Sequence, residues 1–182
     1  TSRRVLAMRL VKGAYWDSEI KWAQQQGLAT YPVYTHKCDT DSSYLICAEM
    51  LLQASATSDG LIYPQFASHN ALTLAAVIKR ANNLNLDYTA FECQRLHGMG
   101  EALYQELTAD GITSRVYAPV GRPKTLLAYL VRRMLENGAN SSFVKQQYQP
   151  NISLSDLLAS PVVESSDFAV KKIDQHQLPI PK

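Results

Sequence analysis

Charged and aromatic side chains of this sequence gather where a short apolar run ends. Arg9 lies in the apolar run 5–11, and Lys12, Gly13 and Trp16 follow it. Cations bind an anionic group, a glycine lets backbone approach a ligand closely, and an aromatic ring stacks on another ring. This cluster therefore predicts either a ligand-binding site or a strand-end ion pair beside core aromatic residues.

Polar residues also follow three later runs. Ser68-His69-Asn70 comes after one run, at a position where backbone N–H groups of a starting helix bind an anion or are simply capped. Arg95 and His97 follow the next run, in Gln94-Arg95-Leu96-His97-Gly98, and Tyr117 ends the last one. The repeated placement after apolar runs predicts that these residues meet at one edge of a sheet.

Two adjacent arginines stand apart from these clusters. Arg132 and Arg133 point about 100° apart on a helix and have apolar neighbours, so both cannot lie on one solvent face. Glu136 is three and four residues further on, within reach of either guanidinium. The pair is interpreted as part of a salt-bridged surface helix or as a binding site for a carboxylate.

Alternating strands and helices must position these residues. Strands are predicted at 5–11, 61–67, 88–94 and 115–118, and helices at 17–27, 41–55, 71–81, 100–108 and 125–137. The first helix has Asp17 or Ser18 as its expected N-cap, and the first strand is expected to be covered on both faces. Pro64 weakens the second strand, because proline cannot donate to a ladder.

Repeated β-α units predict a parallel α/β sheet, in an open doubly wound fold or a (β/α)8 barrel. Gly98-Met99-Gly100 lacks the third glycine of a dinucleotide-binding turn, because Leu103 occupies its position. This favours the barrel. A complete barrel takes about 250 residues, so four units predict a half barrel that ends near residue 150. The Ser-rich and Pro-containing segment 151–182 is predicted to be a terminal extension or an interdomain linker.

Composition excludes several classes of protein. The 182 residues are 46% hydrophobic and 19% charged, which is typical of a globular protein rather than a disordered one. A net charge of +2 gives no nucleic-acid footprint, and no apolar run is long enough to span a membrane. Three cysteines without a CxxC motif predict neither a disulfide framework nor a zinc site, and favour a reducing, cytoplasmic setting. The absence of an initiator Met suggests a piece of a longer protein.

Long motifs resemble those of the bacterial proline dehydrogenases, in the form found inside bifunctional proline utilisation A proteins. They are Arg9-Leu-Val-Lys-Gly-Ala-Tyr-Trp-Asp17, Leu96-His-Gly-Met-Gly100, Tyr117-Ala-Pro-Val-Gly121 and Leu130-Val-Arg-Arg-Met-Leu-Glu-Asn-Gly-Ala-Asn140. The resemblance implies a TIM-type barrel that binds FAD and oxidises L-proline to pyrroline-5-carboxylate by hydride transfer to the flavin. Arg132 and Arg133 would clamp the proline carboxylate, Tyr117 would pack on the proline ring, and Leu96 would line the same pocket.

The resemblance also implies the cofactor contacts. Arg9 would meet the flavin ring, Trp16 would stack on the adenine side, and Glu136 would orient the Arg pair or the ribityl chain. The full implied set is Arg9, Val11, Lys12, Gly13, Ala14, Trp16, Thr35, His36, Lys37, Ser68, His69, Asn70 and Glu136. Two positions depart from the family pattern, with His36 in place of an expected Arg and Ser68 in place of an expected Thr.

The implied partners are L-proline, a C-terminal aldehyde dehydrogenase domain of the same polypeptide, and a quinone or membrane as electron acceptor. The protein would be cytoplasmic, with or without membrane association, and the sequence does not indicate whether the parent protein binds nucleic acid. The alternative is an inactive half barrel that self-associates as a structural or interaction module. A flavin mononucleotide or phosphosugar barrel would share the fold but would leave the Arg pair unexplained.

Overall fold

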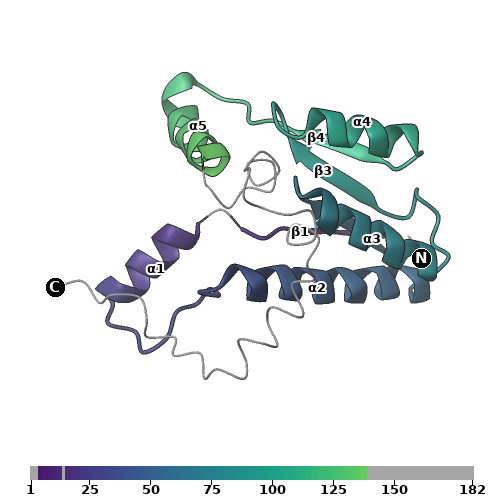
Figure 1. Ribbon diagram of the computed structural model, residues 1–182, viewed down its shortest axis with the longest axis horizontal. Helices are drawn as coiled ribbons and strands as arrows, with labels where there is room; N and C mark the ends of the chain where they lie inside the picture. Colours follow the sequence, from purple (N-terminus) through teal and green to yellow (C-terminus); the bar gives the residue numbers. More distant parts are fainter. Residues whose placement is uncertain (1–3, 14, 139–182) are drawn as a thin grey trace, which may run out of the picture. The chain divides into compact units, whose positions relative to one another are not determined.

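A computed structural model describes residues 4–13 and 15–138 of the chain, with side chains described as far as Arg133. Four strands alternate with five helices in these residues (Figure 1). The strands are β1 (Leu6–Leu10), β2 (Ile62–Ala67), β3 (Glu92–Leu96) and β4 (Ser114–Tyr117). The helices are α1 (Trp16–Gln25), α2 (Lys37–Thr57), α3 (Ala71–Asn83), α4 (Glu101–Ala109) and α5 (Pro123–Gly138). Ala14 and the predicted segment 151–182 lie outside the described residues.

The described chain forms two compact units. One contains the residues up to Val11 and those from Leu45 onward, and the other contains Lys12–Tyr44. All four strands belong to the first unit, whereas α1 and the start of α2 belong to the second. Within the described residues, no helix is long and apolar enough to cross a membrane.

The four strands form one parallel sheet in the order β1-β2-β3-β4. Pro64 lies inside β2, opposite Met8 of β1. The backbone N–H of Ser68 donates to Gln94 of β3, so the N–H positions of alternate β2 residues, including residue 64, face β3. The β2–β3 pairing begins only at Gln65. The missing donor of Pro64 therefore removes no bond from the ladder, and the predicted strand is confirmed.

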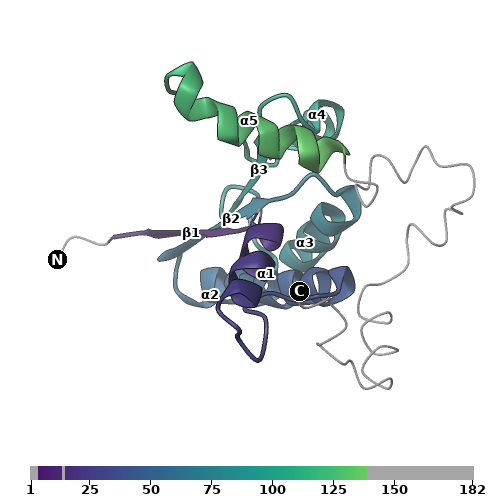
Figure 2. The ribbon, with the colours of Figure 1, turned by 90° about the vertical axis from the view of Figure 1, so that its left-hand side faces the viewer.

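The two faces of the sheet differ in polarity. Phe66 and Cys93, which are paired in register, are fully buried and share one face of the sheet. Figure 2 shows α3 beside the sheet. Phe91 packs edge-on against Phe66, with ring centroids 5.9 Å apart, and Leu74 of α3 is fully buried as well. The opposite face carries polar side chains, because the paired positions Gln65 and Glu92 point there.

The outer strands depart from the expected burial. Leu6 and Met8 of β1 are 58% and 41% exposed, so the prediction that this strand is covered on both faces is wrong for the described residues. Tyr117 at the end of β4 is 49% exposed. Only β2 and β3 have a strand on either side in this sheet.

Element boundaries move by a few residues from the predicted ones. The α1 helix has Tyr15 rather than Asp17 or Ser18 as its N-cap, which places Asp17 in the first turn. Residues 88–91 precede β3, because Asp87 accepts hydrogen bonds from both the N–H and the hydroxyl of Thr89 and closes a turn. The α2 and α5 helices begin earlier than predicted, at Lys37 and Pro123.

Candidate functional site

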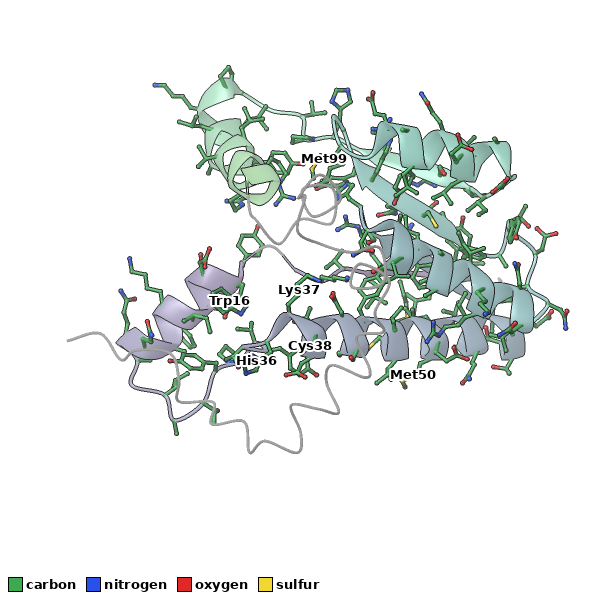
Figure 3. The ribbon with its side chains drawn as sticks, in the orientation of Figure 1. Trp16, His36, Lys37, Cys38, Met50 and Met99 are labelled. Atoms are coloured by element: carbon green, nitrogen blue, oxygen red, sulfur yellow. The ribbon has the colours of Figure 1, made fainter. Side chains whose placement is uncertain are left out.

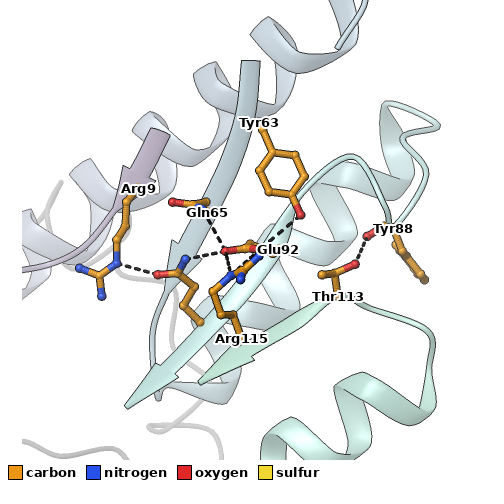
Figure 4. A network of polar contacts seen from close by, with 8 residues as sticks. Arg9, Tyr63, Gln65, Tyr88, Glu92, Thr113 and Arg115 are labelled. Atoms are coloured by element: carbon orange, nitrogen blue, oxygen red, sulfur yellow. Dashed lines mark hydrogen bonds and ion pairs between the residues drawn. The ribbon is translucent and has the colours of Figure 1, made fainter. Parts of the chain in front are cut away.

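A chain of hydrogen bonds crosses the polar face of the sheet and ends at Arg9 (Figure 4). Arg9 Nε donates to the side-chain oxygen of Gln94 over 2.6 Å. Gln94 in turn donates through Nε2 to Oε1 of Glu92, also over 2.6 Å. The guanidinium of Arg9 lies over the ring of Tyr117, 5.2 Å from its centroid. Gln94 of β3 and Tyr117 of β4 therefore hold the side chain of Arg9, which extends from β1.

Glu92 is the acceptor at the centre of this network. Its side chain is fully buried and accepts from Nε and one terminal nitrogen of Arg115, at 2.7 to 3.0 Å. Gln65 donates to Oε1 over 3.0 Å, and the hydroxyl of Tyr63 donates to Oε2 over 3.4 Å. The hydrogen bond from Arg115 outweighs the effect of burial and holds the pKa of Glu92 below its ordinary value. The carboxylate is therefore charged at neutral pH.

Residues from four elements meet near the carboxyl ends of the strands. Leu96 and Tyr117 are paired in register at the ends of β3 and β4. His69, just after β2, accepts the backbone N–H of Leu96 on Nε2 over 3.0 Å. Arg133 of α5 lies close enough to lower the pKa of His69. Figure 1 shows α5 on the side toward which β3 points.

The pKa of His69 falls to about 4, because burial disfavours the imidazolium and the charges of Arg133 and Arg95 repel it. At neutral pH the ring is uncharged, and since Nε2 accepts a hydrogen bond, Nδ1 carries the proton. Gly100 allows the close packing here: it has a φ of 65°, and a Cβ at this position would lie 3.3 Å from Cδ2 of His69.

The predicted cluster Ser68-His69-Asn70 caps a helix. Asn70 accepts the N–H of Thr73 over 3.1 Å and is the N-cap of α3. Ser68 Oγ accepts the N–H of Asn70, also over 3.1 Å. The capping interpretation is thus confirmed, and it leaves the His69 ring to face the strand ends.

The arginine pair lies on α5. The guanidinium of Arg133 stacks over the ring of Tyr129, one turn earlier, at 5.2 Å from the centroid. Both Arg132 and Arg133 are half-buried. This arrangement differs from that of freely solvated surface arginines, because stacking on Tyr129 restricts the orientation of one guanidinium. The side chain of Glu136 lies outside the described residues.

The second unit brings two lysines to one carboxylate. Asp41 accepts from Lys12 on Oδ1 and from Lys37 on Oδ2. Burial alone would raise the pKa of Asp41, but the bonds from Lys12 and Lys37 outweigh it and lower that pKa. Burial also lowers the pKa of Lys12, whose ammonium lies 5.5 Å from the ring centroid of Tyr44. Two cations therefore gather at Asp41, and ammonium groups of this kind bind anionic ligands.

Other predicted cofactor residues precede the two lysines or lie between them in the sequence, and Figure 3 labels Trp16 and His36 together with Lys37. Trp16, on α1, donates through Nε1 to the carbonyl of Tyr34 over 2.8 Å, and its side chain is 42% exposed. Gly13 has a φ of 97°, which favours glycine, and Val11 is 44% exposed. Thr35 and His36 are half-buried in the irregular segment before α2.

Sequence reasoning missed the residues that connect the predicted ones. Glu92, Gln94 and Arg115 join Arg9 to the sheet, and Asp41 joins the two lysines. A signal for the first group exists, because Glu92 and Gln94 are two residues apart in one strand and their side chains therefore share a face. Asp41 has no comparable signal, since acidic residues are common near helix starts.

A family model described as proline dehydrogenase matches residues 1–146. The chain belongs to the proline dehydrogenase family. It is 54% identical over 191 residues to the bifunctional protein PutA of Escherichia coli, with 100% of this chain and 14% of that protein covered. The Rhizobium meliloti protein of the same name is 51% identical over 164 residues, covering 88% of this chain and 13% of the relative.

Solved structures agree with this assignment to the proline dehydrogenase family. A crystal structure of proline utilization A from Bradyrhizobium japonicum matches with a TM-score of 0.81 at 50% identity, covering 98% of this chain and 17% of that one. A proline utilization A structure from Bdellovibrio bacteriovorus, described as inactivated by N-propargylglycine, has a TM-score of 0.79 at 43% identity, covering 87% and 16%. This proline dehydrogenase chain thus spans a small part of its larger relatives.

Proposed function

We propose that this chain supplies part of an FAD-dependent proline dehydrogenase site, within a longer polypeptide. The observation that carries the proposal is Arg9, which Gln94 holds over the ring of Tyr117 at the carboxyl-end edge of a parallel sheet. A parallel sheet whose strands follow chain order supports the C-terminal half of a (β/α)8 barrel, in which catalytic groups occupy this edge. Residues 1–150 would form this half, and 151–182 would lead toward a following domain.

The donor groups present fit FAD. Asp41 brings Lys12 and Lys37 together, and ammonium groups form charge-assisted hydrogen bonds with a pyrophosphate. The indole ring of Trp16 is exposed enough to stack on an aromatic base. When bound, FAD would supply the hydride acceptor for oxidation of L-proline to pyrroline-5-carboxylate.

The substrate would lie between α5 and the strand ends. Arg132 and Arg133 would bind the proline carboxylate, since guanidinium groups pair bidentately with carboxylates. Tyr117 would pack against the ring of proline and Leu96 would line the same pocket. The influence of the Arg133 charge on the pKa of His69 agrees with this arrangement, in which α5 lies near the segment that follows β2.

Substitution of the arginine pair tests the proposal. In the full-length protein, Arg132→Met or Arg133→Met should raise KM for proline by about tenfold or more, since each removes charge-assisted hydrogen bonds to the substrate. The measurement is steady-state kinetics with proline and an artificial electron acceptor. Lys124→Met is the matched control, because Lys124 is an exposed cation in the first turn of the same helix. An unchanged KM in both arginine variants would exclude the proposed substrate site.

A further inference from the structure

The side chain of Gln94 has only one orientation that satisfies its neighbours. Glu92 is an ionised carboxylate and accepts hydrogen bonds only, so the Gln94 amide must turn its NH2 group toward it. The amide oxygen then points to Arg9 and accepts from Nε. Gln94 is 5% exposed, so water does not readily replace either partner.

The guanidinium of Arg9 is bonded at Nε, and its two terminal nitrogens lie at the opposite edge. Its Nε is bonded to Gln94, its guanidinium plane lies over Tyr117, and its two terminal nitrogens make no hydrogen bond to the described part of the chain. The side chain as a whole is exposed. A long, flexible side chain in such a place would sample many rotamers without a fixed contact.

We propose that Gln94 is a positioning residue that, oriented by Glu92, aims the terminal nitrogens of Arg9 at the bound ligand. The inference rests on the proposed function only for the identity of that ligand. Gln94 itself touches neither substrate nor cofactor in this proposal. Its effect reaches the reaction through Arg9 alone.

Gln65 provides a matched control. It donates to the same oxygen of Glu92 as Gln94 does, over 3.0 Å, and although it lies opposite Arg9 in the strand register, it forms no hydrogen bond to Arg9 in the described part of the chain. Gln94→Met and Gln65→Met each remove one donor from Glu92 and keep the side-chain length. A difference between the two variants therefore reports on Arg9 and not on the stability of the buried carboxylate.

Crystal structures of the two variants of the full-length protein test the position of Arg9 whatever the reaction is. In Gln65→Met, the guanidinium should remain over the ring of Tyr117. In Gln94→Met, it should leave that ring. Arg9 in an unchanged position in Gln94→Met would overturn the inference.

Anaerobic flavin reduction by proline, followed by absorbance in a stopped-flow instrument, tests the consequence. Gln94→Met should lower the limiting reduction rate by about tenfold, which corresponds to about 1.4 kcal/mol, with a smaller change in the apparent affinity for proline. Gln65→Met should remain near the wild-type rate. In an Arg9→Met background, Gln94→Met should cause no further loss.

The outcomes separate the two proposals. Equal rates in Gln94→Met and Gln65→Met, or additive losses with Arg9→Met, would overturn the positioning role. If proline does not reduce the flavin of the full-length wild-type protein, the proposed function is overturned. The crystal structures would still decide whether Gln94 positions Arg9.

Discussion

At the scale of single residues, the two members of the Glu92–Arg115 ion pair are buried to very different extents. The side chain of Glu92 is fully buried, whereas that of Arg115 is 62% exposed. Arg115 can regain water if the pair is broken, but Glu92 cannot, because a buried carboxylate without donors is costly. The bonds from Gln94 and Tyr63 therefore add to the larger effect of Arg115 in keeping Glu92 charged.

Glu92→Gln should make the protein less stable at neutral pH, by about 1–3 kcal/mol, since it loses a charge-assisted network. The pKa of Glu92 is lowered by folding, so its contribution is complete above the ordinary pKa of a glutamate and disappears as the pH falls through the lowered value. Denaturant unfolding of both proteins between pH 7 and pH 3 should show the difference shrinking with acid. A constant difference over this range would contradict the assignment.

The three cysteines should differ in reactivity. Burial, together with the charge of Glu92, raises the pKa of Cys93 to about 12, which leaves almost no reactive thiolate at pH 8. Cys47 is only partly buried. Iodoacetamide labelling of the native protein, read by peptide mass spectrometry, should modify Cys47 well before Cys93. Early modification of Cys93 would show that the sheet opens locally.

At the scale of elements, the first turn of α3 depends on one side chain. Asn70→Ala should lower the free energy of unfolding by about 1 kcal/mol, because it removes the acceptor of the Thr73 N–H. Asn70→Asp keeps that acceptor and should retain wild-type stability in thermal unfolding. If Asn70 also contacts FAD near its phosphates, the added charge should weaken FAD binding, which titration of the apoprotein measures.

The elements were largely predictable, because periodicity and capping act locally. The strand at 61–67 and the helix that Asn70 begins follow from an apolar run and a capping residue. The start of β3 was not predictable from propensity, since Tyr88 and Thr89 favour strands yet belong to a turn closed by Asp87. A side chain that bonds to its own backbone outweighs propensity there.

The site was predictable only in part, for a related reason. Arg9, Leu96 and Tyr117 could be placed at strand ends from the order of elements alone. The contact between Gln94 and Arg9 depends on the register of three strands and spans 85 positions in the chain. Register is decided by tertiary packing, so sequence patterns that act within one element cannot specify this contact.

At the scale of the whole molecule, apolar residues of the outer strands face solvent. Val5 and Leu6 are 60% and 58% exposed, and Val116 of β4 is 47% exposed. Strands with unpaired edges and exposed apolar side chains favour association. In the proposed half barrel, the rest of the barrel would cover them.

The purified 182-residue chain should therefore associate with itself and should lack the flavin absorbance of the full-length protein. Size-exclusion chromatography with detection near the flavin absorbance maximum measures both properties. Full-length protein serves as the control and should be yellow and lose its colour with proline. A monomeric, yellow chain that proline bleaches would show that the chain contains a complete site.

The sheet order also has a consequence for synthesis on the ribosome. Because β1, β2, β3 and β4 lie in the sheet in the order in which they occur in the chain, each new strand emerges next to a neighbour that has already been made. None of the four described strands has to insert between two existing ones, and the crossovers contain α1 and α2 in the first case and one helix in each of the other two. The sheet can grow at one edge during translation, while the most recently made strand is the only one that still lacks its following partner.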